Sequence, residues 1–340
     1  MTSLSLVELG PLPEPLRARA FVRPKLCVAI PVFDEEAVLL ETYRRLTEIL
    51  DGLDVDWMLL FVNDGSRDAT PVLLETLFQR DERVAYISLS RNFGHQGALT
   101  AALDNADGDL VISMDADLQH PPELLPLMID AWKRGYDVVH TQKTRTIGRP
   151  RREVFAARFA YRLVRQIVGA QIIPHASDFR LLDRRALDAV RSLPERGRLY
   201  RGLTTWIGFR QCLLPYVAPP RAGGKSHYLF AQRLSVVTRE LFDFSNVPLY
   251  VGLIFGGAAL AFSLLYLGFI TVWFLSAAAT GEERPPGWAS LISVTLVLSS
   301  VSLIFLGIIG VYVARIYAEV RGRPSYLVNT RRVRSDRQTG

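Results

Sequence analysis

The sequence predicts an α/β domain with a mostly parallel sheet, followed by two transmembrane helices. From Lys25 onward, short apolar runs alternate with amphipathic segments, which is the pattern of strands joined by helical crossovers. Residues 249–280 contain no Asp, Glu, Lys, Arg or His, and residues 287–314 form a second run of this kind. Each run is longer than the roughly 20 apolar residues that cross a bilayer.

Five apolar runs have the length and composition of buried strands, at residues 26–32, 58–63, 84–89, 110–114 and 137–141. Residues 35–51 and 71–80 lie between them and place their apolar side chains at helical spacing, so both are expected to be helices. Strands that are joined by helical crossovers run in the same direction, which makes the expected sheet mostly parallel.

Polar residues gather where three of these strands end, at residues 31–36, 63–66 and 115–117. Because ligands bind at the carboxyl ends of strands in open α/β sheets, the three motifs are expected to converge on one site. The chain has neither a G-x-G-x-x-G after its first strand nor a P-loop motif, so this site must hold phosphate in another way. Cys27 and Cys212 lie far apart without ligand spacing, so they indicate neither a disulfide framework nor a zinc site, and both are expected to be small buried hydrophobic residues.

The charges around the two apolar runs predict the orientation in the membrane. Residues 281–286 carry one basic residue, whereas six further arginines follow Arg315. By the positive-inside rule, the α/β domain and both termini are expected on the cytoplasmic side of a bacterial inner membrane. Prolines interrupt residues 1–25, so no secretory signal is expected. The expected order is an N-terminal extension (1–24), the α/β domain (25–228), an amphipathic juxtamembrane segment (229–246), a transmembrane hairpin (247–314) and a basic tail (315–340).

Two acidic residues, Asp115 and Asp117, follow the fourth expected strand and form a candidate metal site. Two carboxylates on such a turn can bind a hard divalent cation, Mg²⁺ or Mn²⁺, that in turn bridges phosphate oxygens. Gln119 adds an amide carbonyl. The alternative is that one Asp caps a helix beginning near Pro121 while the other is solvated. The dense polar string at residues 117–123 favours the metal site.

A basic segment points to a membrane surface. Cations dominate residues 143–165, and apolar side chains recur at helical spacing through residues 151–168. A basic amphipathic helix can lie on an anionic leaflet. A solvated helix face is the alternative. Nucleic-acid binding would also explain the pI of about 9.4, but a basic stripe interleaved with aliphatic residues on an anchored domain fits lipid headgroups better.

Two further segments, residues 177–180 and 221–228, combine hydroxyl groups with charges, and the second also contains glycines. A loop rich in hydrogen-bond donors can close over a diphosphate or a lipid phosphate. On the residues alone, an ordinary surface loop is the simpler interpretation, and Asp178 needs no role beyond a salt bridge with Arg180.

Six motifs carry a resemblance to a known family: Ile30–Glu36, Val62–Ser66, Arg91–Gly94, Asp115–Gln119, Ser177–Arg180, and the stretch from Arg315–Tyr317 to Arg323–Tyr326. On these motifs, from about Leu26 to Val328, the chain resembles inverting family 2 glycosyltransferases of GT-A fold. It is similar in particular to the polyprenyl-phosphate branch, which includes bactoprenyl-phosphate glucosyltransferases and dolichyl-phosphate mannose synthases. Phe33, Asp34 and Asn63 stand where Tyr, Asn and Asp are commoner, so base recognition stays open.

The resemblance implies a role for each candidate residue. The nucleotide-sugar is expected to contact Pro31, Phe33, Glu35, Asp64, Asp115 and Gln119. Asp115, Asp117 and Gln119 are expected to hold the metal, and Asp117 and Asp178 to be catalytic. The acceptor phosphate and the membrane are expected to meet Lys143, Arg149, Arg152, Arg158, Arg180, Arg221, Lys225 and Ser226.

The expected reaction is the transfer of a hexose, glucose from UDP-glucose by the nearest resemblance, to undecaprenyl phosphate. A GDP-mannose or amino-sugar donor is the first alternative. A processive polysaccharide synthase is the second, although the chain lacks the additional spans and the Q-x-x-R-W motif of such enzymes. A membrane-tethered nucleotide-sugar scaffold without turnover is the non-enzymatic alternative. The expected partners are the donor, the lipid acceptor and membrane lipids. A homo-oligomer is compatible with the sequence, and no nucleic-acid partner is expected.

Overall fold

The computed structural model describes residues 23–146, 176–195, 197–218 and 287–334, with some residues between 256 and 276. The chain divides into an α/β unit, residues 1–227 with 323–340, and a second unit, residues 228–322. Each unit is described by itself.

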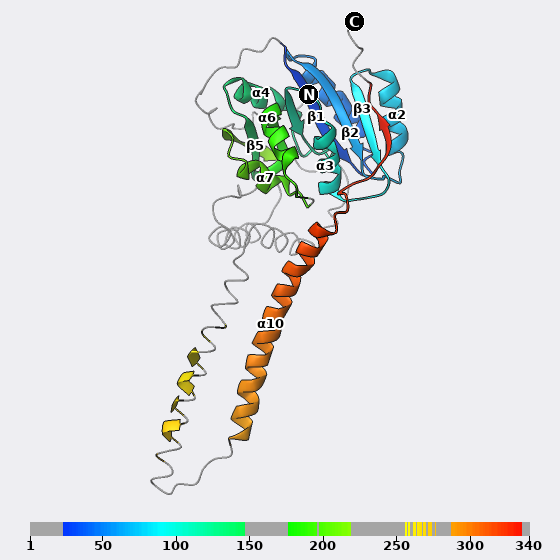
Figure 1. Cartoon of the computed structure of the whole chain (residues 1–340). Coiled ribbons are helices and arrows are strands. Elements are labelled where there is room, and N and C mark those ends of the chain that lie inside the picture. The colour runs from blue at the N-terminus through cyan, green and yellow to red at the C-terminus, as the bar shows by residue number, and fades with distance from the viewer. Residues whose placement is uncertain are drawn as a thin grey trace. The chain divides into compact units, whose positions relative to one another are not determined.

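The α/β unit is built on one eight-stranded sheet with the order β7-β5-β6-β4-β1-β2-β3-β8 (Figure 1). The strands are β1 (Lys25–Val32), β2 (Asp56–Asn63), β3 (Val84–Leu89), β4 (Leu110–Ser113), β5 (Val138–Thr146), β6 (Ala176–Asp183), β7 (Gln211–Ala218) and β8 (Val328–Arg332). Neighbours among β4, β1, β2 and β3 are parallel, as are β5 and β7. β6 is antiparallel to both β4 and β5, and β8 is antiparallel to β3. The predicted mixed, mostly parallel sheet is therefore confirmed.

Helices cover both faces of this sheet. Leu26, Val28 and Ile30 of β1 pack into a core with α1 (Leu39–Leu50), α2 (Thr70–Arg80) and α4 (Leu125–Lys133), which follows a short 3₁₀ turn, η1 (Pro122–Leu124). Cys27 and Ala29, which point the other way, pack with α3 (His95–Asn105), α6 (Arg184–Ser192) and α7 (Tyr200–Trp206). This alternation follows from the two-residue period of a strand. With both faces covered, β1 is buried from its second residue to its end.

The strands of the parallel half agree with the sequence prediction, and those beyond β4 differ from it. β3 coincides with the expected strand at residues 84–89, and β1, β2 and β4 agree with their expected strands within two residues. β5 continues five residues beyond its expected end, and β6 and β7 were not expected. β7 contains Pro215, which an edge strand tolerates because one side of its backbone needs no partner.

The tail returns to the α/β unit, although residues 315–340 were expected to form one separate segment. β8 pairs with the edge of β3, and the backbone N–H of Ser90 donates to the carbonyl of Leu327 at 2.9 Å. The Tyr326 hydroxyl lies 3.3 Å from Asn105 Nδ2 and 3.4 Å from Asp104 Oδ2, at the end of α3. The tail therefore completes one edge of the sheet.

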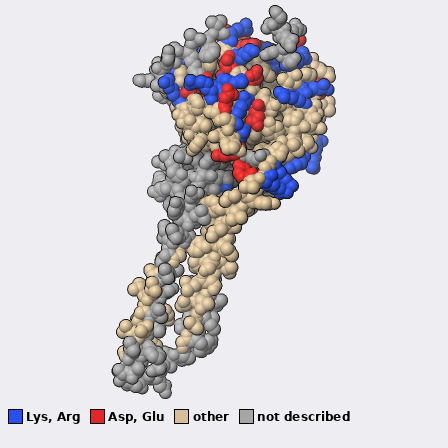
Figure 2. Space-filling model, viewed as in Figure 1, with Lys and Arg blue, Asp and Glu red and all other residues tan. Residues whose placement is uncertain are grey.

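The described part of the second unit contains α10 (Trp288–Val320), which Figure 2 shows without charged side chains over most of its length. Within it, residues 301–320 have the length and hydropathy of a membrane span, and among the described residues this is the one candidate of that kind. The expected helix at residues 249–280 lies largely outside the described residues, so two spans are not established. α10 also continues past Ala314, because Arg315 and Glu319 end the apolar run without breaking the helix.

Candidate active site

Hydrogen bonds join the loops that follow β1 and β2 into one rim. Asp34, in the left-handed region at φ 52°, donates its backbone N–H to Ser66 Oγ at 3.0 Å and accepts from the N–H of Arg67 at 2.8 Å. Glu36 accepts from the N–H of Ala69 at 2.8 Å. The loops after β1 and β2 are therefore hydrogen-bonded to each other, as expected for the ends of neighbouring strands.

Three predicted nucleotide contacts lie at this rim. Phe33 is exposed and Glu35 is half-buried, with its N–H donating to Thr70 Oγ1 at 3.1 Å. Pro31 is buried within β1. Phe33 and Glu35 thus have surface available to a ligand, whereas Pro31 shapes the strand end from within.

Asp64 is the fourth predicted nucleotide contact. It is buried, and both of its carboxylate oxygens accept hydrogen bonds. The backbone N–H groups of Phe93 and Gly94 donate to Oδ1 and Oδ2 at 2.7 and 2.9 Å. Gly65 has φ 72°, and a Cβ there would come within 2.6 Å of the Arg91 carbonyl carbon, so glycine is required for this close approach. Asp64 and Gly65 together fix the segment that leads into α3.

The acidic pair lies on the turn after β4. Asp117 Oδ1 accepts from the N–H of Gln119 at 3.1 Å, and the intervening Leu118 has φ 60°. Thr42 Oγ1 of α1 donates to the carbonyl of Ala116 at 2.9 Å. The side chain of Asp115 is 32% exposed. The turn is thereby held in a defined shape, with Asp115 and Asp117 half-buried at its surface.

His120, which was not predicted as a site residue, is buried beneath this turn and holds its backbone. Its Nδ1 accepts from the N–H of Asp115 at 2.9 Å, its Nε2 lies 2.6 Å from Ser177 Oγ, and its ring stacks on Phe179. Because Nδ1 accepts, the ring hydrogen is on Nε2. Burial lowers the pKa of His120, so the ring is neutral and positions Asp115 without adding charge.

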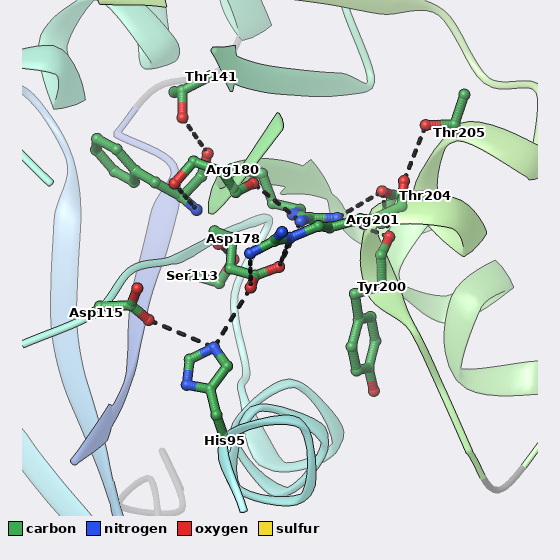
Figure 3. Close-up of polar contacts among 12 residues, drawn as sticks. His95, Ser113, Asp115, Thr141, Asp178, Arg180, Tyr200, Arg201, Thr204 and Thr205 are labelled. Carbon is green, nitrogen blue, oxygen red and sulfur yellow. Dashed lines mark hydrogen bonds and ion pairs between the residues drawn. The ribbon is translucent and has the colours of Figure 1, made fainter. Parts of the chain in front are cut away.

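Asp178 of β6 lies at the centre of a charged cluster (Figure 3). Its carboxylate meets Arg180 Nη2 at 2.8 Å, and Arg201 Nε and Nη2 of α7 at 3.2 and 2.9 Å. Burial alone would raise the pKa of Asp178, but Arg201, His95 and Arg180 hold it well below its ordinary value. Asp178 is therefore a firmly ionised carboxylate and a poor proton acceptor.

Arg180 does not meet the expectation that it contacts an acceptor. Its side chain is fully buried, and it donates to Asp178 and to the carbonyls of Ser177 and Tyr200, with Thr204 Oγ1 as a further acceptor. The salt bridge with Asp178, the simpler role expected from the residues alone, is present. Arg201 is instead the exposed arginine of the pair, with 39% of its side chain accessible.

His95, the first residue of α3, lies between the acidic turn and Asp178. Its Nε2 is 3.6 Å from Asp115 Oδ1 and 3.4 Å from Asp178 Oδ2, and Figure 3 shows the ring pointing between the two. Burial opposes the charged ring, but Asp178 and Asp115 raise the pKa of His95 to about 9. Sequence reasoning missed His95 and Arg201, although His95 directly follows the Arg91–Gly94 motif.

The remaining predicted contacts are only partly described. Lys143 of β5 is half-buried; burial lowers its pKa, while the charges of Asp115 and Asp117 oppose that shift. Its predicted role remains a prediction. Six cations and hydroxyls lie outside the described residues: Arg149, Arg152, Arg158, Arg221, Lys225 and Ser226.

The donor set suits a hard divalent cation that is shared with a substrate. Asp115, Asp117 and Gln119 offer oxygen ligands on one turn, as Mg²⁺ and Mn²⁺ prefer. Among the described residues, no cluster of three or more His, Cys, Asp or Glu side chains could hold a metal alone. Such an ion would complete its coordination with phosphate oxygens and water.

Comparisons with known proteins point to one family. The family described as "Glycosyl transferase family 2" matches residues 27–191. A Bacillus subtilis protein named uncharacterized glycosyltransferase YkcC is 38% identical over 307 residues, which are 88% of this chain and 92% of that protein. The SfII prophage-derived bactoprenol glucosyl transferase of Shigella flexneri is 33% identical over 306 residues, 89% of this chain and 97% of that protein.

A solved structure, the mannosyltransferase PcManGT of Pyrobaculum calidifontis with GDP-Man and Mn²⁺, aligns over 91% of this chain and 88% of that chain. Its identity is 16% and its TM-score 0.44. The family assignment therefore rests on the two relatives in sequence and not on this structure. The family match includes Asp115, Asp178 and His95 but ends before Arg201.

Proposed function

The chain belongs to glycosyltransferase family 2, and we propose that it transfers a hexose from a nucleotide diphosphate to a polyprenyl phosphate. The donor is proposed to be UDP-glucose and the acceptor undecaprenyl phosphate. The name of the Shigella flexneri relative, a bactoprenol glucosyl transferase, supports both choices.

One observation carries the choice of a phosphate acceptor. Asp178 is a buried carboxylate, and Arg180 and Arg201 bind both of its oxygens. A sugar hydroxyl needs a base to take its proton, and a carboxylate held in this way serves that purpose poorly. A phosphate is already ionised at neutral pH and needs no base.

The proposed step balances without a proton acceptor. A lone pair of a lipid phosphate oxygen forms a bond to the anomeric carbon, and the bond from that carbon to the donor diphosphate breaks. The electron pair stays on the departing nucleoside diphosphate, and the anomeric configuration inverts. Asp178 orients Arg201, whose side chain is 39% accessible and is proposed to bind the acceptor phosphate.

On the donor side, Phe33 and Glu35 at the rim are proposed to contact the nucleotide. Asp115 and Asp117, with Gln119, are proposed to hold Mg²⁺ or Mn²⁺. A bound divalent ion neutralises charge that develops on a leaving diphosphate. His120 and Thr42 keep this turn in place.

The membrane arrangement is proposed on the sequence pattern. α10 is one span, the apolar run at residues 249–280 is the second, and both termini are cytoplasmic. A cysteine at Glu282, in the loop between the two runs, should react with an impermeant reagent from the outside, whereas one at Asn329 should not. The reverse pattern would overturn the orientation.

The test of the function is a transfer assay in detergent with purified full-length protein and undecaprenyl phosphate. Radiolabelled UDP-glucose, GDP-mannose and UDP-N-acetylglucosamine are offered separately with Mg²⁺ or Mn²⁺. Lipid-soluble label from UDP-glucose is expected, and it should disappear with EDTA. Product from another donor would correct the sugar. The absence of product from every donor, with UDP binding intact, would favour the scaffold alternative.

The basic segment provides a second test of the acceptor. Replacing Arg149, Arg152 and Arg158 together by Gln should raise the KM for undecaprenyl phosphate by well over tenfold, since each cation near an anionic leaflet contributes about 1 kcal/mol. Affinity for UDP with Mn²⁺ should barely change. An equal loss for both ligands would remove this segment from the acceptor site.

A further inference from the structure

His95 Nε2 faces two carboxylates, and neither contact is as short as a well-formed hydrogen bond. Its Nε2 lies 3.4 Å from Asp178 and 3.6 Å from Asp115. Both distances exceed the 2.7–3.2 Å typical of a well-formed N–H···O bond. The side chain is also 43% exposed. A ligand oxygen can therefore approach this nitrogen without displacing a tight internal bond.

The hydrogen is on Nε2 whatever the charge of the ring. Both neighbouring carboxylates face Nε2, so the neutral ring is favoured in the tautomer that carries its hydrogen there. The charged ring carries that hydrogen as well. The ability of His95 to donate from Nε2 therefore does not depend on its titration.

The backbone around His95 is held on both sides. Asp64 binds the N–H groups of Phe93 and Gly94, the two residues immediately before it. Two residues after it, a Cβ on Gly97 would lie 2.9 Å from Phe93 Cβ and 3.2 Å from the carbonyl oxygen of Ser325. Such close support is what a site needs to hold a side chain in a productive position.

His95 also lies between two groups with different proposed partners. Asp115 belongs to the turn that holds the metal and the donor diphosphate, and Asp178 belongs to the cluster that orients the acceptor. In an in-line transfer, the leaving and attacking phosphates approach one anomeric carbon from opposite sides. A donor placed between the two clusters therefore faces phosphate oxygens from one source or the other.

We propose that His95 is a catalytic residue that donates its Nε2 hydrogen to a phosphate oxygen at this junction. The inference rests on the proposed function, because that function supplies the two phosphates. A hydrogen bond to the leaving diphosphate gains strength as negative charge develops there, and the same bond to the acceptor orients its attack.

The test compares His95→Gln with His95→Met in the full-length protein. A glutamine amide N–H can reach about the position of Nε2, whereas methionine has similar length and no donor. With UDP-glucose, undecaprenyl phosphate and Mn²⁺, His95→Met should lower kcat about a hundredfold. His95→Gln should recover at least a tenth of wild-type kcat. Equal kcat values in the two variants, whether high or low, would overturn the proposal.

Two binding measurements identify the phosphate. If His95 contacts the leaving diphosphate, His95→Met should weaken UDP binding in the presence of Mn²⁺, measured by calorimetry, while His95→Gln preserves it. If it contacts the acceptor, the KM for undecaprenyl phosphate should rise selectively in His95→Met. Unchanged values in both assays, together with unchanged kcat, would contradict either contact.

The failure of the proposed function gives a different result. Wild-type protein would then form no lipid product, and UDP binding alone would decide the role of His95. In that case a loss confined to His95→Met supports donation to a phosphate, and equal affinity in the two variants overturns it. Matching thermal unfolding midpoints for the two variants would show that neither change acts through the fold.

Discussion

The two halves of the sheet place their polar residues differently. In the parallel half, β1 and β2 are apolar along their buried lengths, and the polar residues stand at the strand ends. In the half made by β5, β6 and β7, charged and polar side chains lie inside the sheet. Ser177, Asp178, Arg180, His140 and Thr141 are all less than 5% exposed.

This difference predicts different effects of substitutions in the two halves of the sheet. A half-buried residue at a strand end, such as Asp115, can be changed at little cost to the core, because part of its side chain already meets solvent. A charge inside the sheet must be matched by its partners, since an unpaired buried charge costs several kcal/mol. We therefore expect variants of the first half to lose activity, and variants of the second to lose stability as well.

The largest effect is expected for Asp115→Asn in the parallel half. The change removes a proposed metal ligand that is worth several kcal/mol to the transition state, so transfer should fall at least about a thousandfold. The side chain is 32% exposed, so the thermal unfolding midpoint should barely move. Near-normal transfer would refute the metal site. A large fall in the unfolding midpoint would show that substitutions in the parallel half also cost stability.

The largest loss of stability is expected for Arg180→Met in the other half. Removing one partner of a buried ion pair typically costs about 3–5 kcal/mol. Arg201→Met is the matched control, because Arg201 binds the same carboxylate but is 39% exposed, so its loss should destabilise the protein clearly less than the loss of Arg180. Urea unfolding in detergent measures both. Equal losses would show that burial does not govern this cluster.

A smaller, pH-dependent loss is expected from His140. Gln211 donates its amide hydrogens to the carbonyls of Thr204 and Thr205, so its Oε1 must accept from His140 Nε2. Burial, reinforced by the charge of Arg180, lowers the pKa of His140 from 6.5 to about 4. Between pH 4 and pH 6.5, His140 is therefore protonated in the unfolded chain and neutral in the folded chain.

The stability from neutral His140 is complete above pH 6.5 and is lost as pH falls toward 4. At pH 5 the loss should be about 2 kcal/mol relative to pH 7.5. His140→Gln cannot titrate, so urea unfolding at the two pH values should show a smaller change for that variant. Parallel changes in wild type and variant would mean that other groups dominate the acid sensitivity.

The smallest effect is expected for Tyr326→Phe at the tail. The hydroxyl meets Asp104 and Asn105 at 3.4 and 3.3 Å, so its loss should cost no more than about 1 kcal/mol. Hydrogen exchange at the end of α3 should rise. Unchanged exchange there would show that backbone pairing of β8, and not this side chain, holds the tail.

The parallel half could be predicted from the sequence, because buried parallel strands appear as continuous apolar runs with their ligand motifs at one end. β6 could not, since its Ser-Asp-Phe-Arg core mixes charge with apolar residues and resembles a loop. Val328–Arg332 contains two arginines, and its strand depends on backbone pairing with β3. The buried state of Arg180 and the meeting of His95 with Asp178 arise only from tertiary contacts.

The position of β8 in the chain also sets an order of events during synthesis. β3 leaves the ribosome early, but its edge partner follows only after the whole second unit. At about 5–20 residues per second this interval lasts roughly 10 to 50 s. Throughout it, the edge of β3 is a template for incorrect pairing. Nascent protein whose synthesis stalls within the second unit therefore keeps that edge open, where chaperones and proteases can recognise it.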